Sequence, residues 1–137
     1  MLFSMLGILS ALLTGTAQAK SPENQTAVPQ VERGAYIVND VAMCVQCHTP
    51  RTDSGVLDRV HLLRGAPMPV VSPWPNRPFA VRAPQIAGLP GFRDEDILNL
   101  LTNGVRLDGR VPQAPMPQYR LNRQDAEAVI AYLRSLP

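Results

Sequence analysis

Apolar residues recur with a helical period in three separate stretches of this chain. The first is 31–45, and the second is 94–101, where the opening turn is acidic, as the helix dipole favours, and Asn103-Gly104 forms the stop. The third follows Asn122, a good N-cap residue. Its apolar stripe consists of Ala126, Val129, Ile130, Leu133 and Leu136. The pattern predicts an all-α fold with three main helices.

Proline interrupts the chain between these stretches. Eight of the 14 prolines fall in 49–90, and 107–121 is again rich in proline. Proline cannot sustain a long helix or a central strand. We therefore expect long Pro-rich loops in both segments and, in 49–90, at most a short hairpin.

The N-terminal part has the features of an export signal. Residues 2–13 are almost wholly apolar, 14–18 are small and polar, and Ala17-Gln18-Ala19 matches an A-x-A cleavage site. The alternative, a retained amphipathic helix, lacks a polar face, and the stretch is too short for a stable membrane span. We expect 1–19 to be a cleaved signal peptide, 20–30 a flexible lead-in and 31–137 one domain located in the periplasm.

The chemistry is concentrated in Cys44-Val45-Gln46-Cys47-His48. This C-x-x-C-H motif is the attachment signature of a c-type haem, in which both thiols bind the porphyrin covalently and the adjacent imidazole binds iron. The chain has only two cysteines, so attachment uses both. We predict one covalent haem c, with His48 as an iron ligand.

Two other uses of these cysteines have weaker support. A thioredoxin-like dithiol needs no following histidine and belongs to a βαβ pattern, which the chain lacks. A zinc site would draw on Cys44, Cys47, His48 and His61, but these lack the second spaced pair of finger-type sites.

Size and charge bear on the folding and the partners. A domain this small buries only about two-thirds of the surface that its unfolded chain exposes. A large covalent cofactor would supply apolar core, so we expect the apoprotein to fold poorly. The formal charge is +2, and the haem propionates would remove about two charges, so we predict neither nucleic acid nor a membrane as a partner.

The order of helices and motifs resembles the class I monohaem cytochrome c fold across nearly the whole of 31–137. The resemblance is carried by the stretches Arg33-Gly-Ala-Tyr-Ile-Val, Ala83-Pro-Gln-Ile-Ala-Gly-Leu, Ala114-Pro-Met-Pro and Ala131-Tyr-Leu-Arg-Ser-Leu-Pro. It implies that the first and last helices cross near Gly34, Tyr36 and Tyr132. It also implies that the carbonyl of Pro84 accepts a hydrogen bond from His48. The segment 51–82 departs from compact members of the family.

A low-spin haem needs a second axial ligand. Met43 adjoins Cys44, so we expect it to pack under the helix. Met68 and Met116 share an Ala-Pro-Met-Pro setting whose prolines stiffen the backbone. We favour Met116, because it precedes the terminal helix, where the family places its ligand. Met68 and His61 stay open as alternatives, although a surface or loop role suits His61 better.

The resulting hypothesis is periplasmic one-electron transfer by a His/Met haem, without catalytic residues. The protein would be a soluble carrier or the electron-accepting subunit of a dehydrogenase, linking a donor dehydrogenase to an oxidase or respiratory complex. The alternative is a peroxidase-like enzyme or a gas-binding or sensing module with a labile sixth ligand. Further candidates are Trp74 and Arg77 as propionate contacts, and Arg106, Arg110 and Arg120 as a basic surround of the haem edge that steers an acidic partner.

Overall fold

The structure is a computed structural model and describes residues 29–137. The expected signal peptide, and all but the last two residues of the expected lead-in, lie outside the described residues. None of the helices within 29–137 is long and apolar enough to cross a membrane.

The first helical stretch is divided into three parts. Helix α1 spans Gln30–Tyr36, a π-helical turn η1 spans Ile37–Val41, and a separate short helix α2 spans Val45–His48. The prediction of one helix over 31–45 was wrong, because the backbone bonds change there: the amide of Ala42 donates to the carbonyl of Ile37 (2.7 Å). Met43 then takes a positive φ of 52° and turns the chain. The haem motif thus lies on a helix of its own.

The two later helices agree with the pattern. Helix α3 spans Asp94–Asn103 and ends at Gly104, whose φ of 69° is the left-handed C-cap expected of glycine. Helix α4 spans Arg123–Ser135, and the Asn122 side chain accepts a hydrogen bond from the Asp125 amide (2.8 Å). Both boundaries therefore follow from local capping chemistry.

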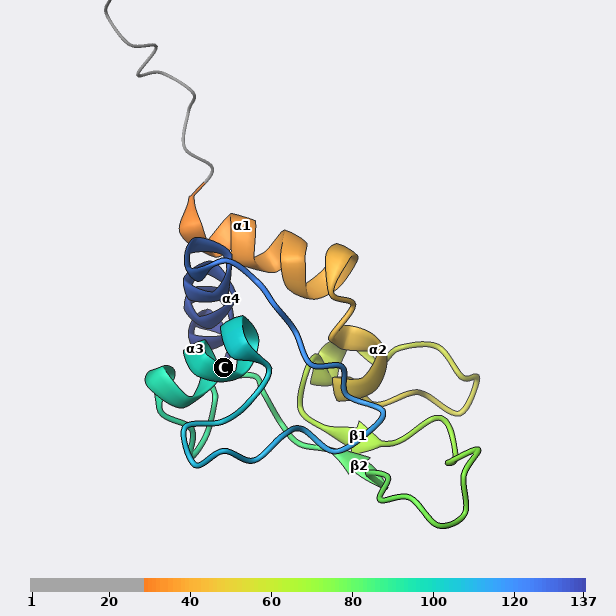
Figure 1. Cartoon of the computed structure of the whole chain (residues 1–137). Helices are drawn as coiled ribbons and strands as arrows, with labels where there is room; N and C mark the ends of the chain where they lie inside the picture. The colour runs from red at the N-terminus through yellow and green to blue at the C-terminus, as the bar shows by residue number, and fades with distance from the viewer. Residues whose placement is uncertain (1–28) are drawn as a thin grey trace, which may run out of the picture.

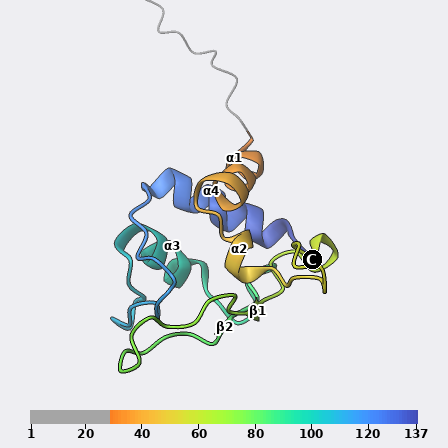
Figure 2. The same ribbon diagram turned by 90° about the vertical axis from the view of Figure 1, so that its right-hand side faces the viewer.

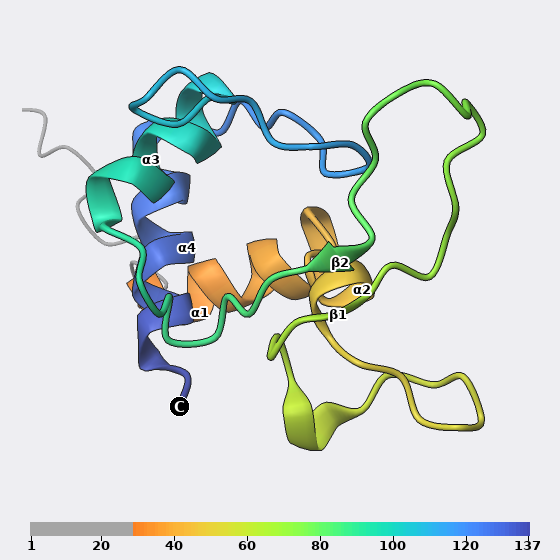
Figure 3. The ribbon, with the colours of Figure 1, turned by 90° about the horizontal axis from the view of Figure 1, so that it is seen from below.

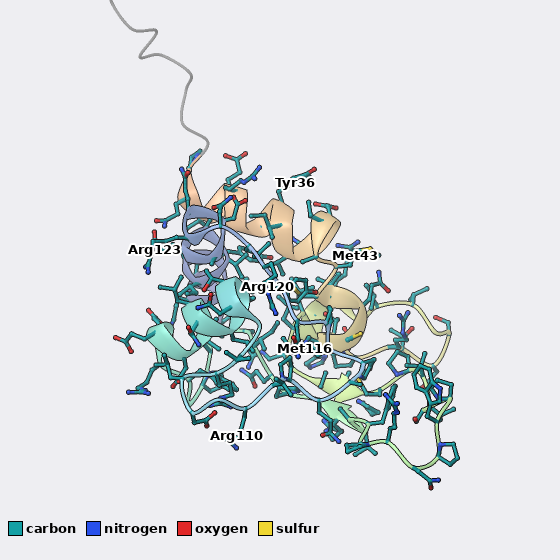
Figure 4. The ribbon with its side chains drawn as sticks, in the orientation of Figure 1. Tyr36, Met43, Arg110, Met116, Arg120 and Arg123 are labelled. Carbon is teal, nitrogen blue, oxygen red and sulfur yellow. The ribbon has the colours of Figure 1, made fainter. Side chains whose placement is uncertain are left out.

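Helices α1 and α4 cross, and the crossing depends on Gly34 (Figures 1 and 3). A Cβ atom at Gly34 would overlap the carbonyl oxygen of Ala128 and lie 2.8 Å from Cβ of Tyr132. Gly34 and Tyr132 thus occupy the crossing, as the resemblance implied. Tyr36 does not: it is 53% exposed and points away from the protein (Figure 4).

The core lies under this crossing and extends to α3. Its fully buried members include Val38 and Leu63, from distant parts of the chain. The other buried hydrophobic members of the cluster are Ile37, Val45, Ala87, Leu89, Ile97, Leu101, Ala126, Val129, Ile130 and Leu133. Arg134 attaches the C-terminal end of α4 to the loop before α3, because its guanidinium donates to the carbonyls of Gly88 and Phe92 (2.7 and 2.6 Å).

The segment 51–82 is mainly loop, with one turn of 3-10 helix, η2, at Arg59–His61. Strands β1 (Ala66–Pro67) and β2 (Arg82–Ala83) pair antiparallel, with Ala66 opposite Ala83. They form the short hairpin that the sequence allowed. The loop between the strands extends well beyond the helices (Figures 2 and 3).

Candidate functional site

The C-x-x-C-H motif is wound around α2. Cys44 caps this helix and its carbonyl accepts from the amide of His48 (2.9 Å), which places both cysteines and the histidine around a single helical turn. Both thiols are free and partly buried. One compact element therefore presents two sulfur atoms and one imidazole to the same cavity.

His48 is oriented by the main chain of another segment. Its Nδ1 lies 2.8 Å from the carbonyl oxygen of Pro84. A carbonyl only accepts, so Nδ1 carries the hydrogen and Nε2 keeps the lone pair that a metal needs. Burial lowers the pKa of His48, which favours the neutral ring. The contact that the resemblance implied for Pro84 is confirmed.

The motif forms one wall of a cavity of about 690 Å³. The walls come from α2, the turn after β2, α3 and the loop between α3 and α4, and they are mainly apolar. Apolar lining residues that the sequence gave no reason to place here are Ile86, Leu89, Phe92, Ile97 and Leu100. The charged side chains on the wall are the arginines 82, 106 and 110, and no carboxylate of residues 29–137 joins them.

Both Ala-Pro-Met-Pro segments reach this cavity. The amide of Met68 donates to Val81 (3.0 Å), and the neighbouring Ala80 amide donates to the carbonyl of Ala114 (2.7 Å). The two segments are thus linked through one stretch of backbone. Met116 is labelled in Figure 4, in the loop in front of α2.

The expectation that Met43 packs under the helix was wrong. Met43 is 50% exposed at the rim of the cavity and is not packed under the helix. Its left-handed backbone, with φ of 52°, turns the side chain outward at the end of the first helical segment (Figure 4).

Tyr119 is a site residue that the sequence analysis missed. Its hydroxyl donates to the carbonyl of Ala42 (2.9 Å), so it ties the loop after Met116 to the residues before the haem motif. Burial, then the neighbouring Cys44 and Cys47, raise the pKa of Tyr119 to about 12. A single aromatic among polar neighbours has no periodic signal, which is why the pattern did not reveal it.

The Cys44 thiol does not have the property expected of a reactive thiol in a redox-active dithiol. Burial raises the pKa of the Cys44 thiol to about 11. Reactive thiols in C-x-x-C redox sites have a lowered pKa, because the thiolate is the nucleophile. Within residues 29–137, no three side chains of the types His, Cys, Asp and Glu gather into a metal-binding group, as the zinc alternative would need.

Several predicted contacts lie away from the cavity. His61 is exposed and pairs with Asp58 (2.6 Å), the loop role that suited it. Trp74 is 61% exposed, and neither it nor Arg77 lines the cavity wall. Arg120 packs over Gly104 and donates to the carbonyl of Tyr119 (2.7 Å), so it does not surround the opening as expected.

The described residues fit a haem with respect to shape, ligands and charge. The cavity is mainly apolar, the thiols and the free Nε2 atom of His48 border it, and methionine sulfur is available on another segment. The buried Nε atom of Arg106 has no hydrogen-bond partner, although the side chain is on the cavity wall. An apolar macrocycle with acidic substituents would satisfy each of these features.

Comparisons with known proteins give a consistent result. The family model described as Cytochrome c matches residues 31–137. The chain is 32% identical over 110 residues to the fructose dehydrogenase cytochrome subunit of Gluconobacter japonicus, covering 77% of this chain and 22% of that protein. It is 29% identical over 114 residues to a diheme cytochrome c-type protein of Cereibacter sphaeroides, covering 80% and 36%.

A third relative is the cytochrome c subunit of a quinone alcohol dehydrogenase from Gluconobacter oxydans. It is 29% identical over 125 residues, covering 80% of this chain and 24% of the relative. The chain therefore spans only between 22% and 36% of the length of these relatives.

Proposed function

This chain belongs to the cytochrome c family, and we propose that it transfers single electrons through one covalent, low-spin haem with His/Met ligation. The observation that carries the proposal is the arrangement of His48. Its Nδ1 is fixed on the Pro84 carbonyl, 2.8 Å away, while the two thiols border the same apolar cavity. The single C-x-x-C-H motif supports one haem of the class I type.

The chain's own residues would hold the group as follows. Cys44 and Cys47 would form the two thioether bonds, and Nε2 of His48 would bind iron. Bound haem supplies a reversible one-electron couple, whose potential methionine ligation raises. The apolar wall excludes water, and the Pro84 carbonyl keeps the imidazole in one orientation.

We assign the sixth ligand to Met116 because of how the two methionine segments are attached. The amide of Gly65, close to Met68 in sequence, donates to the carbonyl of His48 itself (2.7 Å). Met68 therefore belongs to a segment packed on the histidine side. Met116 lies on the loop between α3 and α4, which lines the cavity and meets the other segment through the bond from the Ala80 amide to the Ala114 carbonyl (2.7 Å).

The partners we propose are redox proteins. Two of the three relatives are cytochrome subunits of dehydrogenases, which favours a dehydrogenase as the donor and an oxidase or respiratory complex as the acceptor. The protein would act as a carrier or as an electron-accepting subunit, exchanging electrons at the haem edge in the periplasm. Arg82 and Arg110 on the cavity wall could steer an acidic partner, and this steering would weaken with salt.

The test is a pair of methionine variants in the haem-loaded protein. Met116→Ala should remove the weak long-wavelength absorption band of sulfur-bound ferric haem and lower the midpoint potential, whereas Met68→Ala should leave both nearly unchanged. Exchange of these results would move the sixth ligand to Met68. The band's absence from the unmodified protein, with fast peroxide turnover or tight gas binding, would favour the enzymatic or sensing alternative.

Covalent attachment is tested separately. The haem should stay with the protein in denaturing electrophoresis, and Cys47→Ala should largely abolish accumulation of the holoprotein. Haem that is extracted by acidified acetone would contradict attachment through Cys44 and Cys47.

A further inference from the structure

Arg106 is the most unusual polar side chain that the structure describes. Its Nε is the single buried side-chain nitrogen or oxygen within 29–137 that has no hydrogen-bond partner. A buried donor without a partner is destabilising, and more so when the group is charged. Such a donor calls for an acceptor that the protein chain does not itself provide.

The position of Arg106 is fixed by its surroundings. Its amide donates to the carbonyl of Arg110 (2.8 Å), and its carbonyl accepts from the amide of Gly109 (2.9 Å), which closes a tight turn. The guanidinium carbon lies 5.7 Å from the centre of the Phe92 ring, and both side chains line the cavity. The turn and the ring thus hold the cation at the cavity wall.

Asp108 lies close enough to attract the Arg106 cation, but its salt bridge is with Arg110. Asp108 is the one carboxylate in the turn. Its oxygen accepts from two guanidinium nitrogens of Arg110, at 2.6 and 2.7 Å. The hydrogen bonds of this carboxylate therefore go to Arg110. Arg82 and Arg110 are the other charged groups on the wall, and both are cations. An anion that enters the cavity therefore meets a buried Nε donor of Arg106 that has no partner.

We propose that Arg106 binds a propionate carboxylate of the haem and thereby positions the haem and raises its potential. This inference rests on the proposed function, since the propionate arrives with the cofactor. Charge-assisted hydrogen bonds to carboxylate are the strongest that arginine makes, and they satisfy the orphaned Nε. A cation held beside the haem disfavours the additional positive charge of the ferric state, so it stabilises the reduced form.

The experiment compares Arg106→Gln with Arg110→Gln in the haem-loaded protein. Arg110 is the matched control, because it belongs to the same turn and the same wall but already has a carboxylate partner. The readouts are the midpoint potential and the propionate bending mode in the resonance Raman spectrum. Arg106→Gln should lower the potential and shift the mode, whereas Arg110→Gln should leave the mode unchanged and lower the potential less.

Arg106→Lys keeps the charge and should retain most of the potential, and it remains measurable if Arg106→Gln fails to accumulate. An unshifted propionate mode in Arg106→Gln would overturn the proposal, as would equal effects at Arg106 and Arg110. Where Arg106→Gln does not accumulate, a potential in Arg106→Lys as low as that of Arg110→Gln, or lower, would overturn it. Failure of the proposed function is distinguishable in the unmodified protein, which would then carry no covalent haem or would lack the absorption band of sulfur-bound ferric haem.

Discussion

Two regions of the protein are held in place by different contacts. They are the crossing of α1 and α4, and the segment 51–82. At the crossing, side chains and backbone interlock around Gly34, and most of the inward face of α4 is buried. In 51–82 Leu63 is buried in the core, but several large apolar side chains face solvent: Val60 is 86% exposed, and Val71 is 89% exposed. The segment is attached mainly by backbone bonds, such as those from Gly65 to His48 and from Ile86 to Leu63 (2.7 and 2.9 Å).

This difference indicates where the protein can tolerate change. A packed crossing transmits any change in volume, because interiors are close-packed. A loop that is held mainly by main-chain contacts loses little stability when its exposed side chains change. We therefore expect the cost of substitution to fall steeply from the crossing to the loop.

The largest effect should come from Gly34→Ala. Glycine to alanine inside a helix normally stabilises by about 1 kcal/mol, but here the new methyl group would overlap the Ala128 carbonyl. We expect a loss of about 3 kcal/mol in the free energy of unfolding, measured by guanidinium denaturation of the holoprotein. Gly91→Ala is the comparison: its Cβ would meet no atom within 4 Å, so only the positive φ costs energy, about 1 kcal/mol.

A stabilising or neutral Gly34→Ala would show that the helices can separate without loss. The crossing would then be no more rigid than the loop, and the contrast between the two regions would fail.

An intermediate effect is expected from Asn122→Ala. Its side-chain oxygen caps the first turn of α4 at the Asp125 amide (2.8 Å), so its loss should cost about 1 kcal/mol. Arg123→Ala is the control, because Arg123 makes only an exposed contact with Glu127 (3.3 Å), worth a few tenths of a kcal/mol. Equal costs in thermal unfolding would mean that the cap does not stabilise α4.

The smallest effect is expected in the projecting loop. Trp74→Ser removes a side chain that is 61% exposed, while the hydrogen bonds of Ser72 to the main chain of residue 74 remain. The free energy of unfolding should change by less than about 0.5 kcal/mol. A loss above about 1 kcal/mol would show that Trp74 packs on the domain. The loop would then be as sensitive to substitution as the crossing.

The sequence predicted what depends on local chemistry. The cap at Asn122, the stop at Gly104 and the apolar stripe of α4 are set by neighbouring residues, and all three were predicted correctly. The motif at Cys44 and Cys47 was equally local. The contact between His48 and Pro84 came from a family resemblance, because nothing near either residue encodes their distance.

The misses share one cause, which is packing between distant segments. The helical period of 31–45 continues through Met43, and only the tertiary structure shows that the backbone turns there. Tyr119 reaches the carbonyl of Ala42, and Arg120 folds back over Gly104, through loop paths that no periodicity describes. The two identical Ala-Pro-Met-Pro segments illustrate the point, since one pairs in a hairpin and the other does not.

The π-helical turn Ile37–Val41 changes the direction in which the residues after it, including the haem motif, face. Each residue of a helix advances the direction of its side chain by about 100°. A π-helical turn takes up one more residue than an α-helical turn, so it rotates everything downstream by that angle. Removal of one residue from 37–41 would turn α2 about the axis and carry the His48 ring away from Pro84. The length of this short turn therefore contributes to the direction from which α2 presents the imidazole to Pro84.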